Sequence, residues 1–163
     1  MPPVHIHHHI ATISINNDSD CWAAATAMVM RRHSAAGTAH VKSLVRSARL
    51  PLAADGTLPD SSVRLLAHVV HLRYRAIPGM PLTLRELEGL LQRGPVAAFG
   101  FFNIDNVPVT LQHAVAMYSL IGDGTSQRTT LSLIDPKSQM NPCRYSWQRF
   151  DLQIADITHL LHH

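Results

Sequence analysis

Three residues far apart in the sequence have side chains that together can carry out nucleophilic catalysis. The first is Cys21, which follows the polar stretch Asn16 to Asp20 and precedes a run of small and apolar residues typical of a helix. A thiol in the first turn of a helix meets unpaired N–H groups and the positive end of the helix dipole, which stabilise its thiolate. The sequence therefore predicts a helix that begins at or beside Cys21, with a thiol placed to act as a nucleophile.

His113 and Asp135 are the candidate partners of this thiol. His113 opens an apolar stretch typical of a β-strand, and after the turn Gly122-Asp123-Gly124 a second predicted strand leads back to Asp135. The midpoint of positions 113 and 135 falls at 124, inside the turn, so the two residues should face each other across a hairpin, or nearly so. Facing residues have Cβ atoms about 5 Å apart, close enough for an imidazole to hydrogen-bond a carboxylate. The carboxylate would fix the tautomer and leave the second ring nitrogen to accept the thiol proton.

Each of these residues also has a purely structural interpretation. A lone cysteine is most often a small buried apolar residue, and a histidine in an apolar strand is often a core residue with its hydrogen bonds satisfied. Asp135 precedes Pro136, which is typical of the start of a turn. The predicted alignment of His113 with Asp135, together with a cysteine on a capped helix, favours the catalytic interpretation.

Four helices are predicted in the first two thirds of the chain. Small residues after Cys21 favour a buried helix that ends near Gly37. Apolar residues three and four positions apart indicate the later helices, and the last of them begins with a capping box, Thr83 to Glu86. The apolar positions are Val41, Leu44, Val45 and Ala48 before a stop at Pro51; Val63, Leu66, Ala67 and Val70 after a cap at Asp60; and Leu84, Leu87, Leu90 and Leu91 before Gly94-Pro95.

The remaining chain is predicted to be mostly β-strand. Its apolar stretches are separated by Gly, Asn, Asp and Pro, which favour turns. Helices followed by a mostly antiparallel sheet are typical of an α+β fold, and the length fits one domain, residues 1–163, with a His-rich arm at 1–15. The predicted strands are 96–102, 112–121, 129–134 and 152–160.

Composition and charge narrow the class of protein. Apolar residues make up 46% and charged residues 15% of the chain, the balance of a folded globular protein. The net charge of +3 comes from Lys and Arg residues spread along the chain, so nucleic-acid binding is not expected. No apolar stretch approaches about 18 residues and no signal-peptide pattern is present, so we expect a soluble protein without a membrane span. We expect Cys21 and Cys143 to stay reduced, and no cofactor to be needed.

His5, His7, His8 and His9 form a tract near the amino terminus. Such a tract has three interpretations: an ordered or frayed arm, the remnant of an added tag, or a site for a metal ion. The arm is the simplest of the three, and we predict no metal site.

Several short motifs occur in an order that resembles the papain-like cysteine peptidase superfamily. Within it the similarity is greatest to the bacterial double-glycine peptidase-like branch and to related effector proteases, and it extends from about residue 13 to about residue 155. The motifs are Cys21-Trp22-Ala23-Ala24-Ala25, Gly94-Pro95-Val96, Gln112-His113-Ala114-Val115, Ile134-Asp135-Pro136 and Tyr145 to Phe150.

The resemblance implies a helical half that carries the nucleophile and a sheet half that carries the base, with substrate in the cleft between them. Cys21, His113 and Asp135 match the positions of the family's catalytic triad. The family also has a glutamine a few residues before the cysteine, whose amide helps to form the oxyanion hole, and this glutamine is missing here. Asn16 and Asn17 are the nearest substitutes, although asparagine in a turn is more often a backbone cap.

The expected function is therefore that of a thiol protease, a hydrolase that cleaves peptide bonds through an acyl-enzyme, with Gly-Gly sites as the first candidates. The resemblance also implies a bacterial effector or toxin that works in the cytoplasm or is delivered into a target cell by a specialised secretion system. Its partners would be a protein or peptide substrate and an inhibitory immunity protein. The alternatives are a glutamine deamidase or cell-wall peptide amidase with the same triad, or a papain-like binding module without activity.

Overall fold

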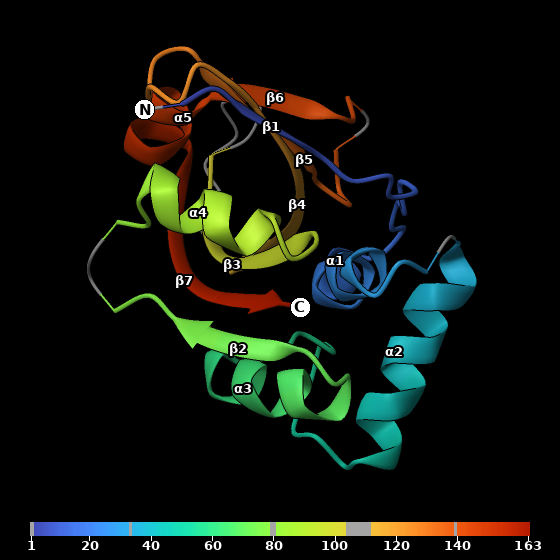
Figure 1. The fold of residues 1–163 in the computed structure, drawn as a ribbon. Helices are drawn as coiled ribbons and strands as arrows, with labels where there is room; N and C mark the ends of the chain where they lie inside the picture. Colours follow the sequence, from blue (N-terminus) through green and yellow to red (C-terminus); the bar gives the residue numbers. More distant parts are fainter. Residues whose placement is uncertain (1, 33, 79–80, 104–111, 139) are drawn as a thin grey trace.

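A curved antiparallel sheet lies between two sets of helices, and it curls around helix α4 (Figure 1). This computed structural model describes residues 2–32, 34–78, 81–103, 112–138 and 140–163. Their arrangement confirms the predicted α+β class. The elements are β1 (Val4–His7), η1 (Asp18–Asp20), α1 (Cys21–Val29), α2 (Ala35–Ser47), α3 (Asp60–Val69), β2 (Arg73–Ala76), α4 (Leu84–Leu91), β3 (Val96–Phe102), β4 (His113–Gly122), β5 (Thr129–Ile134), β6 (Cys143–Ser146), α5 (Trp147–Arg149), η3 (Phe150–Ile154) and β7 (Ala155–His162).

Strand β4 is the centre of the sheet. In the described residues the strands follow the order β2-β7-β3-β4-β5-β6, and each neighbouring pair is antiparallel. β3 pairs with the first half of β4, whereas β1 pairs with its second half, where Val4 lies opposite Gly122. β5 pairs with the other edge of β4. β1 therefore lies on the same edge of β4 as β3, beside the part of β4 that β3 does not reach. His113, the first residue of β4, is thereby fixed in a strand with partners on both sides.

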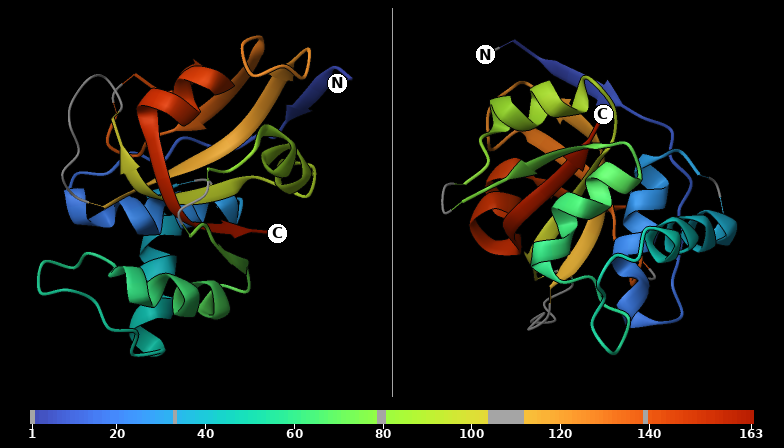
Figure 2. Two further views of the ribbon diagram at one scale, coloured as in Figure 1. Left: turned by 90° about the vertical axis from the view of Figure 1, so that its left-hand side faces the viewer. Right: turned by 90° about the horizontal axis from the view of Figure 1, so that it is seen from below.

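The two faces of the sheet support two separate cores. Successive side chains of a strand point to opposite faces, so Ala97 and Phe99 of β3 pack towards α1 while Val96 and Ala98 pack towards α4. All nine residues of α1 are buried, since its small side chains allow close contact with the sheet and with α2. Figure 2 shows α1 and α4 on opposite faces of the sheet.

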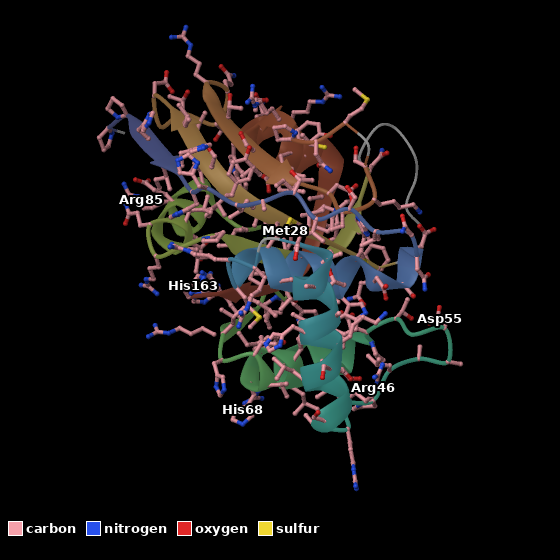
Figure 3. All side chains as sticks on the ribbon, turned by 90° about the vertical axis from the view of Figure 1, so that its right-hand side faces the viewer. Met28, Arg46, Asp55, His68, Arg85 and His163 are labelled. Atoms are coloured by element: carbon pink, nitrogen blue, oxygen red, sulfur yellow. The ribbon has the colours of Figure 1, made fainter. Side chains whose placement is uncertain are left out.

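In the helical half, buried side chains lie next to the sheet and exposed side chains lie on the outer side. Met28 of α1 is fully buried, whereas Arg46 of α2 and His68 of α3 are exposed at the periphery (Figure 3). The helical half thus has an apolar inner surface and a charged outer surface, as expected for helices that cover one face of a sheet.

Helix α1 starts where the sequence predicts, at Cys21, but the predicted end near Gly37 is wrong. The helix ends at Val29, because Arg31 takes the left-handed conformation with φ of 57°. A new helix, α2, then begins after Ser34, whose side chain accepts a hydrogen bond from the N–H of Ala36. Gly37 therefore lies in the first turn of α2 and does not stop α1.

The other helix predictions hold with one correction. The capping box is confirmed, since the Thr83 and Glu86 side chains each accept a hydrogen bond from the other's backbone N–H. Asp60 does not cap α3: it is the first helical residue, and Pro59 takes the N-cap position. The Asp60 carboxylate instead pairs with Nε2 of His159 at 2.7 Å.

The strand predictions are confirmed for β3 and β5 to the residue and for β4 within one residue at each end. The prediction of a strand from residue 152 is wrong, because Phe150–Ile154 form a single π-helical turn and β7 starts at Ala155. The four-residue strands β2 and β6 were not predicted, and β1 lies within the arm at 1–15, for which a strand was one of the possibilities. Four residues are too few to establish an alternating pattern in the sequence.

The longest helix in the described chain, α2, has 13 residues, so no helix there is long and apolar enough to cross a bilayer. Those residues also hold no group of three or more His, Cys, Asp or Glu side chains placed to hold a metal ion. The His-rich arm forms β1, and His8 beyond it hydrogen-bonds the backbone oxygen of Leu91 through Nε2 at 2.6 Å.

Gly37 permits the close packing of α2 on α1. A Cβ atom at this position would lie 2.5 Å from Cβ of Arg32 and 3.3 Å from Cβ of Ala27. We therefore expect Gly37→Ala to lower the free energy of unfolding by about 1–3 kcal/mol, although alanine normally favours a helix. Urea unfolding followed by circular dichroism measures the change.

Gly89→Ala is the matched control. Gly89 lies inside α4, and a Cβ atom there meets no other atom of the described chain within 4 Å. Alanine at this position should raise the free energy of unfolding by about 0.4–1 kcal/mol. Equal stabilisation by both substitutions would contradict the proposed contact between α1 and α2.

Candidate active site

Cys21, His113 and Asp135 come together at one place in the structure. Nε2 of His113 lies 2.6 Å from Oδ1 of Asp135, and these two residues are only 7% and 5% exposed. The thiol of Cys21 lies close enough to the same imidazole to contribute to its raised pKa. Because the carboxylate occupies Nε2, Nδ1 is the nitrogen left for the thiol. The arrangement brings together the three residues predicted to act as nucleophile, base and orienting group.

Three different elements supply these side chains. Cys21 is the first residue of α1, His113 is the first residue of β4, and Asp135 directly follows β5. Helix α1 packs against β3 and β4, which brings its amino-terminal end to the start of β4. The contact therefore depends on the packing of the helical half against the sheet.

The hairpin register differs slightly from the predicted one. Ala116 faces Ile134, so the same register continued by one residue would place Asp135 beside Val115 and not beside His113. The position of the turn causes the offset, since pairing ends at Gly122 and Thr129, and this register alone would place Asp135 opposite Ala116, three residues from His113. The register shift between Met117 and Ser119 then reduces the offset to two residues. An offset of two residues keeps both side chains on one face, and the hydrogen bond forms diagonally.

The loop after β5 holds Asp135 through a residue that the sequence analysis missed. Oδ1 of Asn141 accepts a hydrogen bond from the N–H of Asp135 at 2.9 Å, and its Nδ2 donates to the carbonyl oxygens of Asp135 and Ser138. The Asp135 carboxylate also accepts from the N–H of Lys137 at 2.8 Å. The only sequence signal was an asparagine before a proline in a turn-forming stretch, which does not identify its partners.

The same loop is tied to the segment before the candidate nucleophile. The N–H of Ile15 donates to the carbonyl of Pro136 at 3.1 Å. Nζ of Lys137 lies 2.9 Å from Oδ2 of Asp18, an exposed ion pair that contributes little by itself. The carboxylate loop and the entry to α1 are therefore attached directly to each other.

The two oxyanion candidates have different surroundings. Asn17 acts as an N-cap, because its Oδ1 accepts a hydrogen bond from the N–H of Ser19 at 3.2 Å. Asn16 is exposed beside it. Capping uses the carbonyl of the Asn17 side chain, whereas an oxyanion hole needs the N–H₂ group. The role of either residue as an oxyanion donor stays a prediction.

Electrostatics favour a charged imidazole at this site. Burial by itself lowers the pKa of His113, but hydrogen bonds to Asp135 and to Cys21, and attraction to both groups, raise it from 6.5 to about 9. At neutral pH the ring is then mostly imidazolium. The site therefore places a positive charge close to the sulfur of Cys21.

A second polar network begins one residue before His113. Gln112 donates through Nε2 to the carboxylate of Asp60, which also pairs with His159. Nδ1 of His159 in turn lies 3.0 Å from the hydroxyl of Tyr74. The network links α3, β7 and β2 to the start of β4 and so restrains the backbone that carries His113. Its members are distant in sequence, and no local pattern indicated it.

The raised pKa of His113 predicts how stability depends on pH. The pKa is higher in the folded chain, about 9, than the ordinary 6.5, so protonation stabilises the folded state. This contribution is fully present below pH 6.5 and is lost as the pH rises through 9. The difference in urea midpoint between the natural chain and His113→Gln should therefore shrink between about pH 6.5 and 10. An NMR titration of the imidazole with a midpoint near 6.5 would contradict this expectation.

Asn141 is predicted to act by positioning Asp135. Asn141→Ala removes the hydrogen bonds to the backbone of Asp135, so we expect a loss of about 1–3 kcal/mol in the free energy of unfolding. The pKa of His113 should also fall back towards 6.5, because the carboxylate is less well placed. Asn103→Ala, at an exposed position, is the control and should leave both quantities unchanged. An unaltered His113 titration in Asn141→Ala would mean that Asn141 supports the loop alone.

Comparison with known proteins adds no relative to this picture. Neither a family model nor a curated protein matches the chain. The functional assignment therefore depends on the contact of thiol, imidazole and carboxylate described above.

Proposed function

We propose that this chain is a papain-like cysteine peptidase with Cys21 as nucleophile, His113 as acid and base, and Asp135 as the group that orients His113. One observation carries the proposal: a single buried imidazole hydrogen-bonds a carboxylate and is also close to a thiol that helps to raise its pKa. A core histidine needs only satisfied hydrogen bonds, whereas this one joins the groups required for acyl transfer.

The proposed reaction begins with the thiolate of Cys21 and the imidazolium of His113. The sulfur attacks the carbonyl carbon of a peptide bond and forms a tetrahedral intermediate. His113 then donates its proton to the leaving nitrogen, the C–N bond breaks, and a thioester remains on Cys21. In the second half His113 takes a proton from water, the hydroxide attacks the thioester, and the carboxylic acid leaves as the thiolate and imidazolium are restored.

The exposure of the site bears on the substrate. Cys21 and His113 are only 6% and 7% exposed, so little of either side chain is accessible from solvent. A substrate with small residues next to the scissile bond can approach such side chains most closely. This supports Gly-Gly peptide bonds as the first substrates to test.

Alkylation of the two cysteines tests the proposal directly, because each is 6% exposed and access is matched. Iodoacetamide should label Cys21 at least about ten times faster than Cys143 at pH 7, since only the thiolate reacts and Cys21 lies beside the imidazolium of His113. Asp135→Asn should slow the labelling of Cys21 and leave that of Cys143 unchanged. Equal rates at both cysteines would refute an activated nucleophile.

The same variants decide the reaction in an assay with Gly-Gly peptides and with a mixed protein substrate, read by mass spectrometry. Cys21→Ala should abolish turnover and Cys143→Ala should retain it. Hydrolysis of a peptide bond gives two fragments, whereas deamidation adds about one dalton to an intact chain. Turnover in which all substrate chains stay intact would exclude a peptidase. Turnover that persists in Cys21→Ala would exclude Cys21 as the nucleophile.

A further inference from the structure

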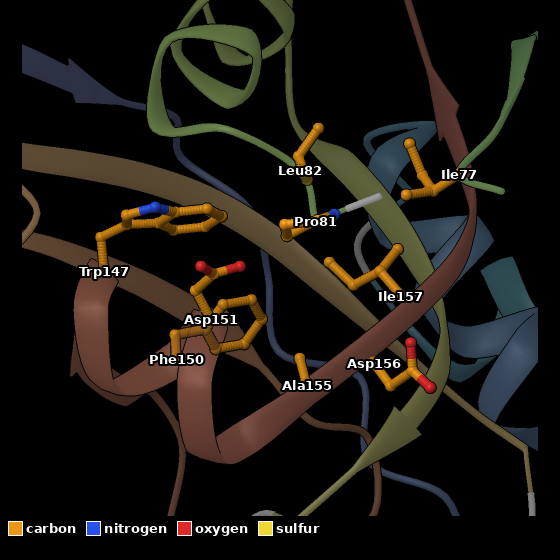
Figure 4. A pocket seen from close by; sticks show the side chains of 9 residues that line it. All are labelled: Ile77, Pro81, Leu82, Trp147, Phe150, Asp151, Ala155, Asp156 and Ile157. Carbon is orange, nitrogen blue, oxygen red and sulfur yellow. The ribbon is translucent and has the colours of Figure 1, made fainter. Parts of the chain in front are cut away.

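A separate hollow lies on the face of the sheet opposite α1. It is a cavity of about 270 Å³, and most of its lining belongs to the apolar core around α4 (Figure 4). The rings of Trp147 and Phe150 form one wall, and aliphatic side chains, among them Leu82 and Ile157, form the other. Pockets for drug-sized ligands are typically about 300–1,000 Å³, so this cavity suits one extended side chain.

A carboxylate projects into this apolar surrounding. Figure 4 shows the carboxylate of Asp151 near the indole of Trp147 and the ring of Phe150, whose centroids are 5.7 Å apart. Burial raises the pKa of Asp151. A second carboxylate, that of Asp156, lies at the other end of the lining. The pocket therefore combines an apolar wall with negative charge.

No cation of the described chain neutralises this charge. Among the described residues neither Asp151 nor Asp156 forms an ion pair. Two arginines from neighbouring elements are engaged elsewhere: Arg75 pairs with Glu86, and the guanidinium of Arg149 lies 5.6 Å from the ring centre of Tyr145. A partly desolvated carboxylate without a cation is unfavourable, and a cationic ligand would relieve this.

A second hollow shares part of the lining. Trp147 and Asp151 also border a cavity of about 440 Å³ that includes Leu152, whose side chain is 71% exposed. A ligand that places one side chain in the first cavity thus has a further apolar surface for the residues beside it. This favours a polypeptide over a free amine as the ligand.

We propose that the cavity between Trp147 and Ile157 binds a lysine or arginine side chain of a protein ligand. The aliphatic stem packs against the rings and the aliphatic wall, and the charged end meets the Asp151 carboxylate and the face of an aromatic ring. Asp156 adds attraction for the same charge. The site is distinct from the triad and does not depend on the proposed peptidase activity.

NMR on the full-length chain tests this site, because its two tryptophans give separate indole N–H signals. Trp147 lines the cavity, whereas Nε1 of Trp22 donates to the carbonyl of Gly56 on the other face. The probes are the N-acetyl, N-methylamide derivatives of lysine and arginine, with the norleucine derivative as a neutral analogue of similar length. The two cationic probes should shift the Trp147 signal in a saturable manner and leave that of Trp22 in place.

Charge is tested with one pair of variants. Asp151→Asn should weaken binding of the lysine probe by about tenfold or more, and norleucine should bind the natural chain about tenfold more weakly than lysine. Asp55→Asn, which removes a carboxylate on the opposite side of the sheet, should leave binding unchanged. The rate at which iodoacetamide labels Cys21 reports that each variant is folded.

Equal binding of the norleucine and lysine probes, or unchanged lysine binding in Asp151→Asn, would overturn the site. So would the absence of a shift of the Trp147 signal up to about 50 mM probe, a concentration at which even very weak sites are occupied. A failure here leaves the labelling of Cys21 and peptide hydrolysis unaffected. The two proposals can therefore fail independently.

Discussion

The contact between His113 and Asp135 is the interaction on which the rest of the candidate site depends. Both residues are almost fully buried, and a buried ion pair is stable only when its geometry is good and its remaining hydrogen bonds are satisfied. The N–H of Lys137 meets the carboxylate, the thiol of Cys21 meets the other side of the ring, and Asn141 fixes the backbone. Each of these contacts offsets part of the desolvation cost of the pair.

This constraint accounts for much of the architecture. An imidazole between two groups must sit on a strand that cannot shift, and β4 has partners along both edges. The thiol must approach closely, which the small residues of α1 allow by letting the helix pack tightly on the sheet. The loop that carries Asp135 is bonded to the segment before Cys21. The thiol of Cys21 and the carboxylate of Asp135 therefore reach His113 from two segments that are bonded to each other.

Short sequence patterns made part of the fold and of the candidate site predictable. The polar residues before Cys21 indicated the start of α1, the box at Thr83 the start of α4, and the turn after β4 brought His113 near Asp135. The errors concern features that no sequence pattern specified. Helix α1 ends early because Arg31 takes the left-handed conformation, so Gly37 falls inside the next helix. The hairpin turn lies later than predicted, and the register shift in β4 only partly offsets this. Asn141 and the network around Asp60 could not be foreseen, because their partners lie in other elements. Only the folded chain selects those partners.

The contrast between Asp135 and Asp151 connects the two proposals. Both carboxylates are partly or wholly withdrawn from water, and both therefore need a positive partner. For Asp135 that partner is His113, whose positive charge balances the carboxylate within the fold. The same contact fixes the orientation of the His113 ring. For Asp151 the described chain provides aromatic and aliphatic neighbours and no ion pair. The Asp151 carboxylate, which has no cation in the described chain and lies beside a cavity of one side chain's size, would be stabilised by a cation from a ligand. This is the physical basis for the second binding site proposed on the face opposite α1.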